Sequence, residues 1–457
     1  MLTTRQTLSV KIIDLNYLGQ GVAKEEGMII FIDGAIPGDF AEIKIIEQKK
    51  KFAVGKLIKI ITPSVDRINP PCEYYDDCGG CQMMHMSYEA QLICKKDRVI
   101  NELKRASVNT EDVLINDTIG MNTPFNYRNK TTFSVSRKNN EIIIGPYEQG
   151  TYNTVDINNC MLQSNYADNV IALFKKLMKK YKLEPYDKNS GKGIIRNIVL
   201  RSNRQNDLML IIVTAKEEFP NKDNLINDLK SNAKEIKTIV QNINDKKTNL
   251  AMGHKNIILH GKGIIEDYIG ELKFAISPET FFQINPQQTE ILYETAINYA
   301  GLSKDDICFD IYCGIGTISL MAAKHAKKVY GVEIVEQSII NAKENAVINN
   351  ISNTEFYAGK AEEVIPRLYK NNIKADVVIV DPPRKGCEKE VIDTINDMQP
   401  KKIVYVSCNP STLARDIKLL EAGGYKLKKV QPIDQFPWSV HVECVILMQN
   451  CGFEGEK

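Results

Sequence analysis

The sequence predicts an α/β protein in which a small all-β barrel and a mixed α+β region precede a doubly wound, mostly parallel sheet. Three features lead to this prediction. From Asp305 onward, short apolar runs alternate with helical segments, and residues 8–60 contain alternating apolar runs broken by glycine. The third feature is length, because 457 residues exceed the size at which one hydrophobic core stops growing. We expect domains at 1–61, 62–270 and 271–457.

The N-terminal barrel is predicted from period-two patterning with a turn signal about every ten residues. The apolar runs are LSVKIIDLNYLGQGVAK, GMIIFIDGAIPGDFAEIKI and FAVGKLIKI, and the proline-bearing stretch 62–71 follows as a linker. Six lysines in this region could form a local basic patch for nucleic acid or could simply face water along a strand edge: Lys44, Lys49, Lys50, Lys51, Lys56 and Lys59.

Composition limits the class of protein. Hydrophobic residues make up 43% and charged residues 25% of the chain, as in ordinary soluble proteins, and the formal net charge is only +2. Net charge alone therefore does not indicate a nucleic-acid-binding protein. There is no signal-peptide pattern at the start and no apolar run of about 18 residues, so we expect a cytoplasmic protein without a membrane span. The 11 cysteines are then expected to be reduced.

The central region predicts two helices and two strands but little chemistry. Residues 87–103 and 167–180 have apolar residues near helical spacing, whereas 196–201 and 208–213 are typical of strands. Cationic groups at 127–130 and 196–201 are candidates for contacts with nucleic acid, and they could equally be structural ion pairs.

A glycine turn opens the C-terminal sheet. The stretch DIYCGIG at 310–316 follows the first strand and precedes a helix, so Gly314 and Gly316 allow a tight turn and a close approach of the backbone to a ligand. The next strand ends on Glu333, where an acidic residue typically holds ribose hydroxyls. A third glycine is missing, which argues against a bound pyrophosphate and favours a cofactor without phosphates. The alternative is a glycine turn beside a surface glutamate.

Three later strands carry reactive groups. Asp381 heads the turn DPPRKG, and Cys408 lies in SCNP after the following strand. Both are expected beside the glycine turn, because the carboxyl ends of parallel strands meet at one edge. A helix starting near Ser411 would help to stabilise a Cys408 thiolate, although a lone cysteine after a strand is usually a small buried hydrophobe. Glu443 in the apolar strand VECVILM is costly unless it is paired or functional; otherwise it is a surface glutamate on an edge strand.

Four cysteines form a separate pattern. Cys72, Cys78 and Cys81 have the spacing C-x5-C-x2-C, and Cys160 is a distant fourth thiol. Four thiolates suit zinc or an iron–sulfur cluster. The C-x3-C-x2-C spacing of radical enzymes is absent, so a closed, non-radical cluster is favoured over a set of buried free thiols.

Six segments of the C-terminal half occur together: SPETFFQIN, DIYCGIGTISL, GVEIVEQSIINAKENAVIN, IVDPPRKGC, VYVSCNPSTLARD and HVECV. In order and spacing they resemble the RNA uracil-5 methyltransferases, which act on ribosomal RNA and on the T-loop of transfer RNA. The resemblance covers essentially the whole chain. It implies a Rossmann-like class I methyltransferase domain behind an N-terminal TRAM/OB-like barrel, with S-adenosylmethionine as the cofactor and RNA as the partner.

The resemblance also implies roles for individual positions. Cys408 matches the nucleophile that adds to carbon 6 of uracil and so puts electron density on carbon 5, and Glu443 matches the base that removes the carbon 5 proton. Gln283 and Asp381 are expected close to the uracil. The implied cofactor pocket consists of Gln283, Tyr312, Gly314, Gly316, Glu333 and Asp381. One departure is Trp438-Ser439, where many members have His-Thr.

The cysteine pattern resembles the 4Fe–4S site of the ribosomal RNA branch of this family, which implies Cys72, Cys78, Cys81 and Cys160 as the ligands. We therefore expect a monomeric enzyme that methylates carbon 5 of specific uridines in 23S ribosomal RNA. The alternatives are the same chemistry on transfer RNA and an RNA-binding scaffold with an inactive methyltransferase fold, although such a scaffold should have lost one of the reactive groups.

Two other enzyme classes fit the sequence less well. An exocyclic-amine methyltransferase also uses an Asp-Pro-Pro or Asn-Pro-Pro turn, but it would need no nucleophilic cysteine. A cytosine-5 RNA methyltransferase does use a cysteine, normally after proline or threonine, whereas here Ser407 precedes Cys408.

Overall fold

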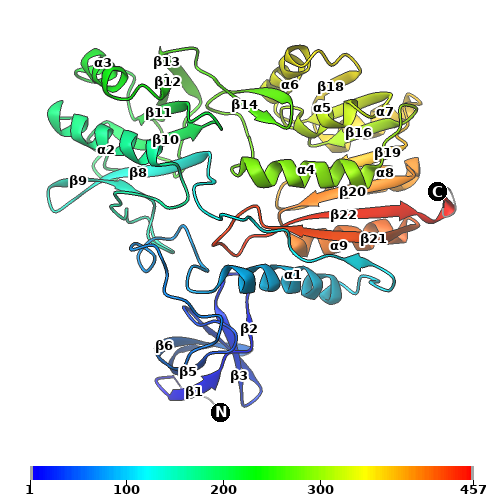
Figure 1. Ribbon diagram of the computed structural model, residues 1–457, viewed down its shortest axis with the longest axis horizontal. Coiled ribbons are helices and arrows are strands. Elements are labelled where there is room, and N and C mark those ends of the chain that lie inside the picture. The colour runs from blue at the N-terminus through cyan, green and yellow to red at the C-terminus, as the bar shows by residue number, and fades with distance from the viewer. Residues whose placement is uncertain (1–3, 454–457) are drawn as a thin grey trace.

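The computed structural model describes residues 4–453, and its N-terminal part is a small all-β unit (Figure 1). The strands are β1 (Thr7–Lys11), β2 (Asp14–Leu15), β3 (Gly21–Glu25), β4 (Met28–Ile32), β5 (Phe40–Gln48) and β6 (Phe52–Thr62). They form one sheet in the order β1-β5-β6-β4-β3-β2. Its core is a cluster of buried aliphatic side chains that includes Ile12, Ile30, Ile32, Ile43 and Ile45. The all-β unit predicted from the period-two patterning is thereby confirmed.

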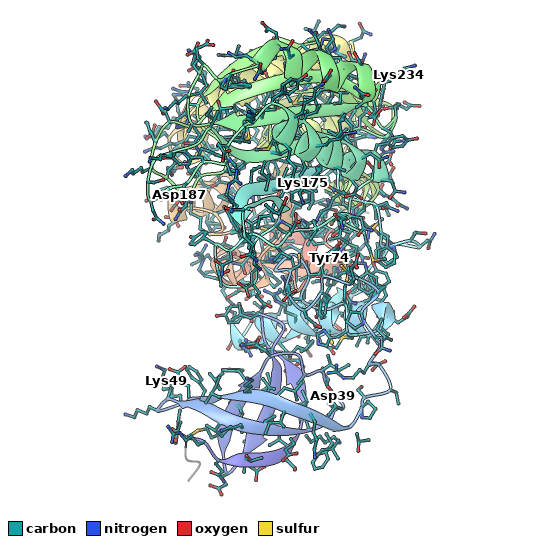
Figure 2. The ribbon with its side chains drawn as sticks, turned by 90° about the vertical axis from the view of Figure 1, so that its left-hand side faces the viewer. Asp39, Lys49, Tyr74, Lys175, Asp187 and Lys234 are labelled. Atoms are coloured by element: carbon teal, nitrogen blue, oxygen red, sulfur yellow. The ribbon has the colours of Figure 1, made fainter. Side chains whose placement is uncertain are left out.

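This β unit forms a lobe of its own beneath the rest of the molecule (Figure 2). Buried Asp39 ties the lobe to the linker that follows it. One carboxylate oxygen of Asp39 accepts a hydrogen bond from the Ser64 backbone N at 2.9 Å, and the Arg67 guanidinium pairs with the same carboxylate at 2.5 Å. Because both donors lie in the linker, these contacts fix the lobe against the segment that follows it.

Helix α1 (Tyr88–Arg105) lies between the β lobe and the C-terminal sheet (Figure 1). The Ser87 side chain caps it by accepting from the Ala90 backbone N, and Val99 and Leu103 on its buried face join the core of the C-terminal sheet. The next strand, β7 (Leu114–Ile115), pairs in parallel with the edge of that sheet. This segment, between the lobe and the central sheet in sequence, therefore packs on the C-terminal sheet.

The central sheet has the order β13-β12-β11-β10-β8-β9. Two helices, α2 (Asn165–Lys180) and α3 (Lys222–Asn232), pack against each other and close one side of it (Figure 1). The helix predicted at 167–180 and both predicted strands of this region are present, and the helix predicted at 87–103 is α1. The strands are β8 (Lys130–Lys138), β9 (Glu141–Gly145), β10 (Ile195–Ser202), β11 (Leu208–Thr214), β12 (Ile236–Ile243) and β13 (Lys255–His260), and the hairpin β14 (Ile265–Ile269) and β15 (Leu272–Ile276) leads out of the sheet.

The C-terminal sheet is doubly wound, as predicted. Its order is β18-β17-β16-β19-β20-β22-β21-β7, and β16 to β20 run parallel while β22 runs antiparallel between β20 and β21. Helices α4, α5 and α6 pack on one face, and α1, α7, α8 and α9 pack on the other. The elements are α4 (Pro286–Ala300), β16 (Ile307–Ile311), α5 (Thr317–Ala323), β17 (Lys328–Glu333), α6 (Glu336–Ile348), β18 (Thr354–Ala358), α7 (Ala361–Lys370), β19 (Val377–Val380), α8 (Lys389–Met398), β20 (Lys402–Ser407), α9 (Pro410–Ala422), β21 (Tyr425–Ile433), β22 (Glu443–Asn450) and the 3-10 turn η1 (Cys451–Phe453).

The strand register brings five chain segments to one edge of this sheet. Ile311 lies opposite both Val332 and Val380, and Ser407 lies opposite Cys444. The residues that follow β16, β19 and β20, the last residue of β17 and the first residue of β22 therefore share the carboxyl edge of the parallel strands. Within the described residues, no helix is both long enough and apolar enough to cross a membrane.

Candidate active site

A cavity of about 760 Å³ opens at the carboxyl edge of the C-terminal sheet. Most of the site residues predicted from the sequence line it together: Gln283, Tyr312, Gly314, Glu333, Asp381, Cys408 and Glu443. Gly316 does not line the cavity; it precedes α5 in the left-handed conformation, with φ at 82°. The volume is in the range of small-molecule sites.

The glycine turn has the backbone geometry that its sequence requires. Tyr312, Gly314 and Gly316 all have positive φ, at 70°, 55° and 82°. A side chain on Gly316 would be strained at that φ and would lie 3.1 Å from the Phe356 ring. Nothing lies within 4 Å of the position that a Cβ on Gly314 would occupy, so the cavity reaches the backbone there.

Glu333 lies over this turn, not on an unrelated surface. One of its carboxylate oxygens accepts from the Gly314 backbone N at 3.3 Å, and the other accepts from the Val335 backbone N at 2.9 Å. A carboxylate held by backbone donors at the end of β17 can still accept hydrogen bonds from the hydroxyls of a ribose.

Several groups in or beneath the cavity have no role predicted from the sequence. Asp310 is fully buried under the glycine turn, where the Ser319 hydroxyl donates to it and burial raises its pKa to about 7. Arg384 and His441 line the cavity. They belong to the motifs DPPRKG and HVECV, so these motifs could have identified both residues as part of the site. Phe281, which is 69% exposed, and Phe436 add aromatic surface.

Cys408 lies in a turn that is hydrogen-bonded to the Asp-Pro-Pro turn. The Ser407 hydroxyl oxygen accepts from the Asn409 backbone N at 3.1 Å, and the Asn409 side-chain amide donates to the Arg384 carbonyl at 2.9 Å. Asn409 also caps α9, which begins at Pro410, one residue before the start expected from the sequence. Cys408 is only partly buried, so its thiol remains accessible from the cavity.

The electrostatic surroundings of Cys408 oppose its ionisation. Burial, together with the nearby carboxylates of Glu443 and Asp381, raises the pKa of the thiol to about 11, while the Arg384 guanidinium opposes the rise. The predicted stabilisation of a thiolate therefore needs a positive group or neutral carboxyls beside it, and Arg384 is the positive group that faces it.

Glu443 is a buried carboxyl, and the partly buried Asp381 lies near enough to act on it. Burial raises the pKa of Glu443 to about 8, with Asp381 adding to the rise and Arg384 opposing it. Burial also raises the pKa of Asp381 to about 7, with Asp310 adding to that rise. Glu443 is neither exposed nor on an edge strand, because β22 lies between β20 and β21. Two carboxyls with pKa values near neutrality can hold and release protons at the cavity wall.

The loop of residues 434–441 connects β21 to β22 and carries His441 to the cavity. Lys95 of α1 forms a buried ion pair with Asp434, and the backbone N atoms of Gln82 and Met83 both donate to the Trp438 carbonyl, at 2.9 and 3.0 Å. Trp438 has a φ of 68°, and its indole N donates to the Pro124 carbonyl at 2.7 Å. The loop is thus fixed by segments from three distant parts of the chain.

Comparison with known proteins assigns this geometry to a family. The family model for tRNA (uracil-5-)-methyltransferase matches residues 87–451, and the TRAM domain model matches residues 2–58. The chain belongs to the tRNA (uracil-5-)-methyltransferase family. Its N-terminal β lobe is a TRAM domain, and the C-terminal sheet is the methyltransferase fold expected from the sequence.

The methyltransferase is similar over its full length to proteins from several bacteria. Uncharacterized RNA methyltransferases of Clostridium tetani and Bacillus cereus are 45% and 44% identical, covering 98% and 96% of this chain and 97% and 95% of theirs. The crystal structure of the Pyrococcus abyssi tRNA (uracil-54, C5)-methyltransferase in complex with S-adenosyl-L-homocysteine has a TM-score of 0.77 at 26% identity, over 96% of this chain and all of that one. The enzyme class expected from the sequence is thereby confirmed.

The four predicted cluster cysteines of the methyltransferase lie near one another. Burial raises the pKa of the Cys81 thiol to about 12, with Cys160, Cys78 and Cys72 adding to the rise. The buried guanidinium of Arg128 opposes it. Within residues 4–453, however, no three cysteine, histidine or acidic side chains are arranged as a group that could hold a metal ion. The chemistry of the four thiol donors nevertheless fits an iron–sulfur cluster.

Several cationic residues that were candidates for contacts with nucleic acid form ion pairs or hydrogen bonds within the protein. Lys49 pairs with Glu47 at 2.5 Å and Lys59 with Glu42 at 3.0 Å on the TRAM surface. Arg196 donates to the carbonyl oxygens of Asn244, Lys246 and Thr248 in the central domain. Buried Arg201 donates to two more backbone carbonyls, of Pro278 and Thr280. These groups are therefore poorer candidates for RNA contacts than Arg384.

Proposed function

We propose that this methyltransferase transfers a methyl group from S-adenosylmethionine to carbon 5 of a uridine in RNA through a covalent adduct with Cys408. The observation that carries the proposal is that one cavity is shared by the thiol of Cys408, the buried carboxyl of Glu443, and the Glu333 carboxylate over the glycine turn. A nucleophile, a base and a ribose-binding group are the parts that this reaction requires.

The cofactor end of the cavity fits a nucleoside without phosphates. Gly314 leaves open space at the backbone, the Glu333 carboxylate can accept from two ribose hydroxyls, and Tyr312 lines the same end of the cavity. When bound, S-adenosylmethionine supplies an electrophilic methyl group on sulfur. Gln283 and Asp381 line the same wall, and we assign them to both the cofactor and the uracil.

The chemistry begins at Cys408. The thiol releases its proton to solvent, and the sulfur adds to carbon 6 of the uracil, which makes carbon 5 an enolate-type nucleophile. Arg384 favours this step because its positive charge lowers the pKa of the thiol. After carbon 5 has gained the methyl group, Glu443 in its carboxylate form takes the carbon 5 proton. The carbon–sulfur bond then breaks, the uracil ring is restored, and the thiolate is free for the next cycle.

The raised pKa of Glu443 suits this role. A carboxylate whose conjugate acid has a pKa near 8 is a stronger base than an exposed glutamate, so it takes the carbon 5 proton more readily, and it then returns that proton to solvent. One proton is released for each methyl group transferred.

For the RNA, we propose large-subunit ribosomal RNA, with transfer RNA as the alternative. The spacing of Cys72, Cys78, Cys81 and Cys160 supports the first, since it resembles that of the ribosomal RNA branch. The name of the Pyrococcus enzyme supports the second. We propose that residues 1–61 and 62–270 bind the RNA and that 271–457 carry out the transfer.

We also propose that the four cysteine thiolates hold a 4Fe–4S cluster. Their mutual proximity, the thiolate donor set and the buried positive charge of Arg128 support this, because a cluster with four thiolate ligands is negatively charged. No step of the methyl transfer is assigned to it.

The test is release of tritium from RNA transcripts labelled at carbon 5 of uracil, given to anaerobically purified protein with S-adenosylmethionine. Release should depend on the cofactor, vanish in Cys408→Ala, and persist in the control Cys451→Ala, whose thiol is exposed and remote from the cavity. Methylation without tritium release would exclude carbon 5. Parallel assays with ribosomal and transfer RNA transcripts decide the substrate.

A further inference from the structure

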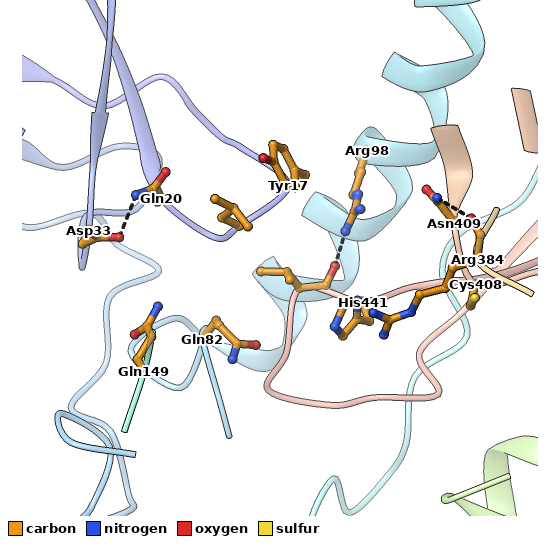
Figure 3. A pocket seen from close by; sticks show the side chains of 12 residues that line it. Tyr17, Gln20, Asp33, Gln82, Arg98, Gln149, Arg384, Cys408, Asn409 and His441 are labelled. Carbon is orange, nitrogen blue, oxygen red and sulfur yellow. Dashed lines mark hydrogen bonds between the residues drawn. The ribbon is translucent and has the colours of Figure 1, made fainter. Parts of the chain in front are cut away.

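A second cavity, of about 790 Å³, lies between the TRAM domain and the C-terminal sheet (Figure 3). It shares Arg384, Cys408 and His441 with the cofactor cavity, so the thiol faces both. A uracil on the thiol must have its methyl-accepting carbon toward the cofactor, and its ribose and phosphates must leave by another route. This second cavity is the route that meets the same thiol.

The end of this cavity near the thiol is lined by two guanidinium groups, those of Arg98 and Arg384. Arg98 of α1 donates from Nη1 to the Val440 carbonyl at 2.5 Å, while its buried Nε has no partner among the described residues. Glu102, one turn further along the helix, forms its ion pair with Arg105, although its charge also acts on Arg98. Figure 3 shows the Arg384 side chain beside His441, with Arg98 above them. A backbone phosphate is the group that such a pair of guanidinium groups binds.

The far end of the cavity is an exposed apolar tip. Tyr17 and Leu18, in the loop between β2 and β3, are 65% and 50% exposed although both are large and hydrophobic. The loop is ordered by Asn16, whose side-chain oxygen accepts from the backbone N atoms of Leu18 and Gln20 at 2.9 and 3.0 Å. A tyrosine ring presented on a rigid loop is a stacking surface for an unpaired base.

From these contacts we propose that the second cavity binds the RNA strand next to the target uridine, with a phosphate on Arg98 and a neighbouring unpaired base stacked on Tyr17. The inference rests on the proposed function for its choice of RNA strand. It assigns one role to each of two domains. The TRAM loop stacks on an unpaired base, and α1 binds the RNA backbone between that base and the thiol. Duplex RNA would not satisfy both, because its bases are not free to stack on a side chain.

The experiment measures the dissociation constant of unmodified ribosomal and transfer RNA transcripts by filter binding, without cofactor, at several salt concentrations. Tyr17→Ala should weaken binding of the preferred transcript about tenfold with an unchanged salt slope. Arg98→Gln should weaken it and reduce the slope of log affinity against log salt by about 0.7, the value for one single-strand phosphate. Arg98→Lys should retain the slope.

Matched controls on the TRAM surface are Ile46→Ala, an exposed aliphatic residue outside both cavities, and Gln48→Ala at the end of the same strand. Both should bind as wild type does. If Tyr17→Ala matches Ile46→Ala, or if Arg98→Gln keeps the wild-type slope while remaining folded, the strand does not occupy this cavity. Because binding is read without methyl transfer, these results are independent of whether carbon 5 is the atom modified. If the wild-type protein releases no tritium while Tyr17→Ala and Arg98→Gln still bind RNA more weakly than the controls, only the proposed reaction is overturned.

Discussion

Lys95 and Asp434 form an ion pair that is buried almost completely between α1 and the 434–441 loop. Tyr88 donates its hydroxyl to the second oxygen of Asp434 at 2.8 Å, and Lys95 also donates to the Phe436 carbonyl at 3.1 Å. The pair connects a helix near the start of the chain to the loop that leads into Glu443. It therefore fixes the position of a loop that no local sequence pattern would hold in place.

Removing one member of this pair should be costly. Lys95→Met leaves the Asp434 carboxylate buried without its partner, and we expect a loss of about 3–5 kcal/mol in the free energy of unfolding. The control is Lys96→Met, since Lys96 pairs with Asp117, whose side chain is 96% exposed, and such pairs contribute about 1 kcal/mol or less. Chemical denaturation of the three proteins measures the difference. Equal midpoints would mean that the buried pair contributes no more than the surface pair.

The buried carboxyl of Glu443 predicts how stability depends on pH. Its pKa rises on folding from the ordinary 4.5 to about 8, so the folded state binds the proton more tightly than the unfolded state does. The resulting stabilisation is complete below about pH 4.5 and is lost as pH rises toward 8. Glu443→Gln should flatten the decline of the denaturation midpoint across this window. A parallel decline in wild type and variant would assign it to other groups.

Arg384 predicts a shift in the pH dependence of the reaction. Its charge lowers the pKa of both Cys408 and Glu443, so Arg384→Gln should move the rise of adduct formation to higher pH. The measurement is the single-turnover rate of covalent adduct formation with labelled RNA between pH 6 and about 9, at saturating RNA. Arg384→Lys, which keeps a positive charge, should retain most of the wild-type profile. A profile lowered in amplitude but not displaced would point to a role in RNA binding only.

Glu333 predicts a selective effect on the cofactor. Glu333→Ala removes a carboxylate acceptor from the glycine turn and should weaken binding of S-adenosylhomocysteine by about 10- to 100-fold, the range for hydrogen bonds to a charged group. Glu336→Ala, at the exposed first turn of α6, is the control. Calorimetric titration of all three proteins measures the affinities. Similar affinities for both variants would place the ribose elsewhere.

The cysteine group predicts a metal content. Protein purified without oxygen should contain about four iron atoms per chain, and Cys81→Ala should lose most of them. Cys94→Ala is the control because Cys94 packs with Met83 and Met86 in a separate cluster, away from the proposed ligands. Zinc in place of iron, or equal iron in both variants, would contradict the assignment of a 4Fe–4S cluster to these thiols.

The carboxyl edge of the C-terminal sheet could be predicted from sequence because its signals are local. Each of β16, β17, β19 and β20 is a short apolar run that ends in a distinctive turn. Strands β18 and β21 were not predicted. β18 has only five residues and one buried side chain, Phe356, while β21 mixes lysines with its apolar residues, so its strand character depends on pairing with β22.

The remaining features depend on contacts between distant segments. Nothing in the sequence around Leu114 indicates that β7 pairs with β21, more than 300 positions further on. The second cavity is equally invisible, since its walls come from the TRAM loop at Tyr17, from α1 and from the turn at Cys408. Local residue patterns identify reactive side chains at the ends of strands. They do not indicate which other domains lie beside those side chains.

Trp438 is the one tryptophan of the chain, and its indole packs in the cluster that contains Cys72, Cys81 and Cys160. It is also part of the loop that leads to Glu443. The tryptophan emission of the protein therefore comes from a single point between the cysteine group and the loop that leads to Glu443. Assembly or loss of a cluster, and displacement of the loop by RNA, should each change the intensity or colour of that emission. The enzyme carries its own optical reporter, and no label needs to be attached.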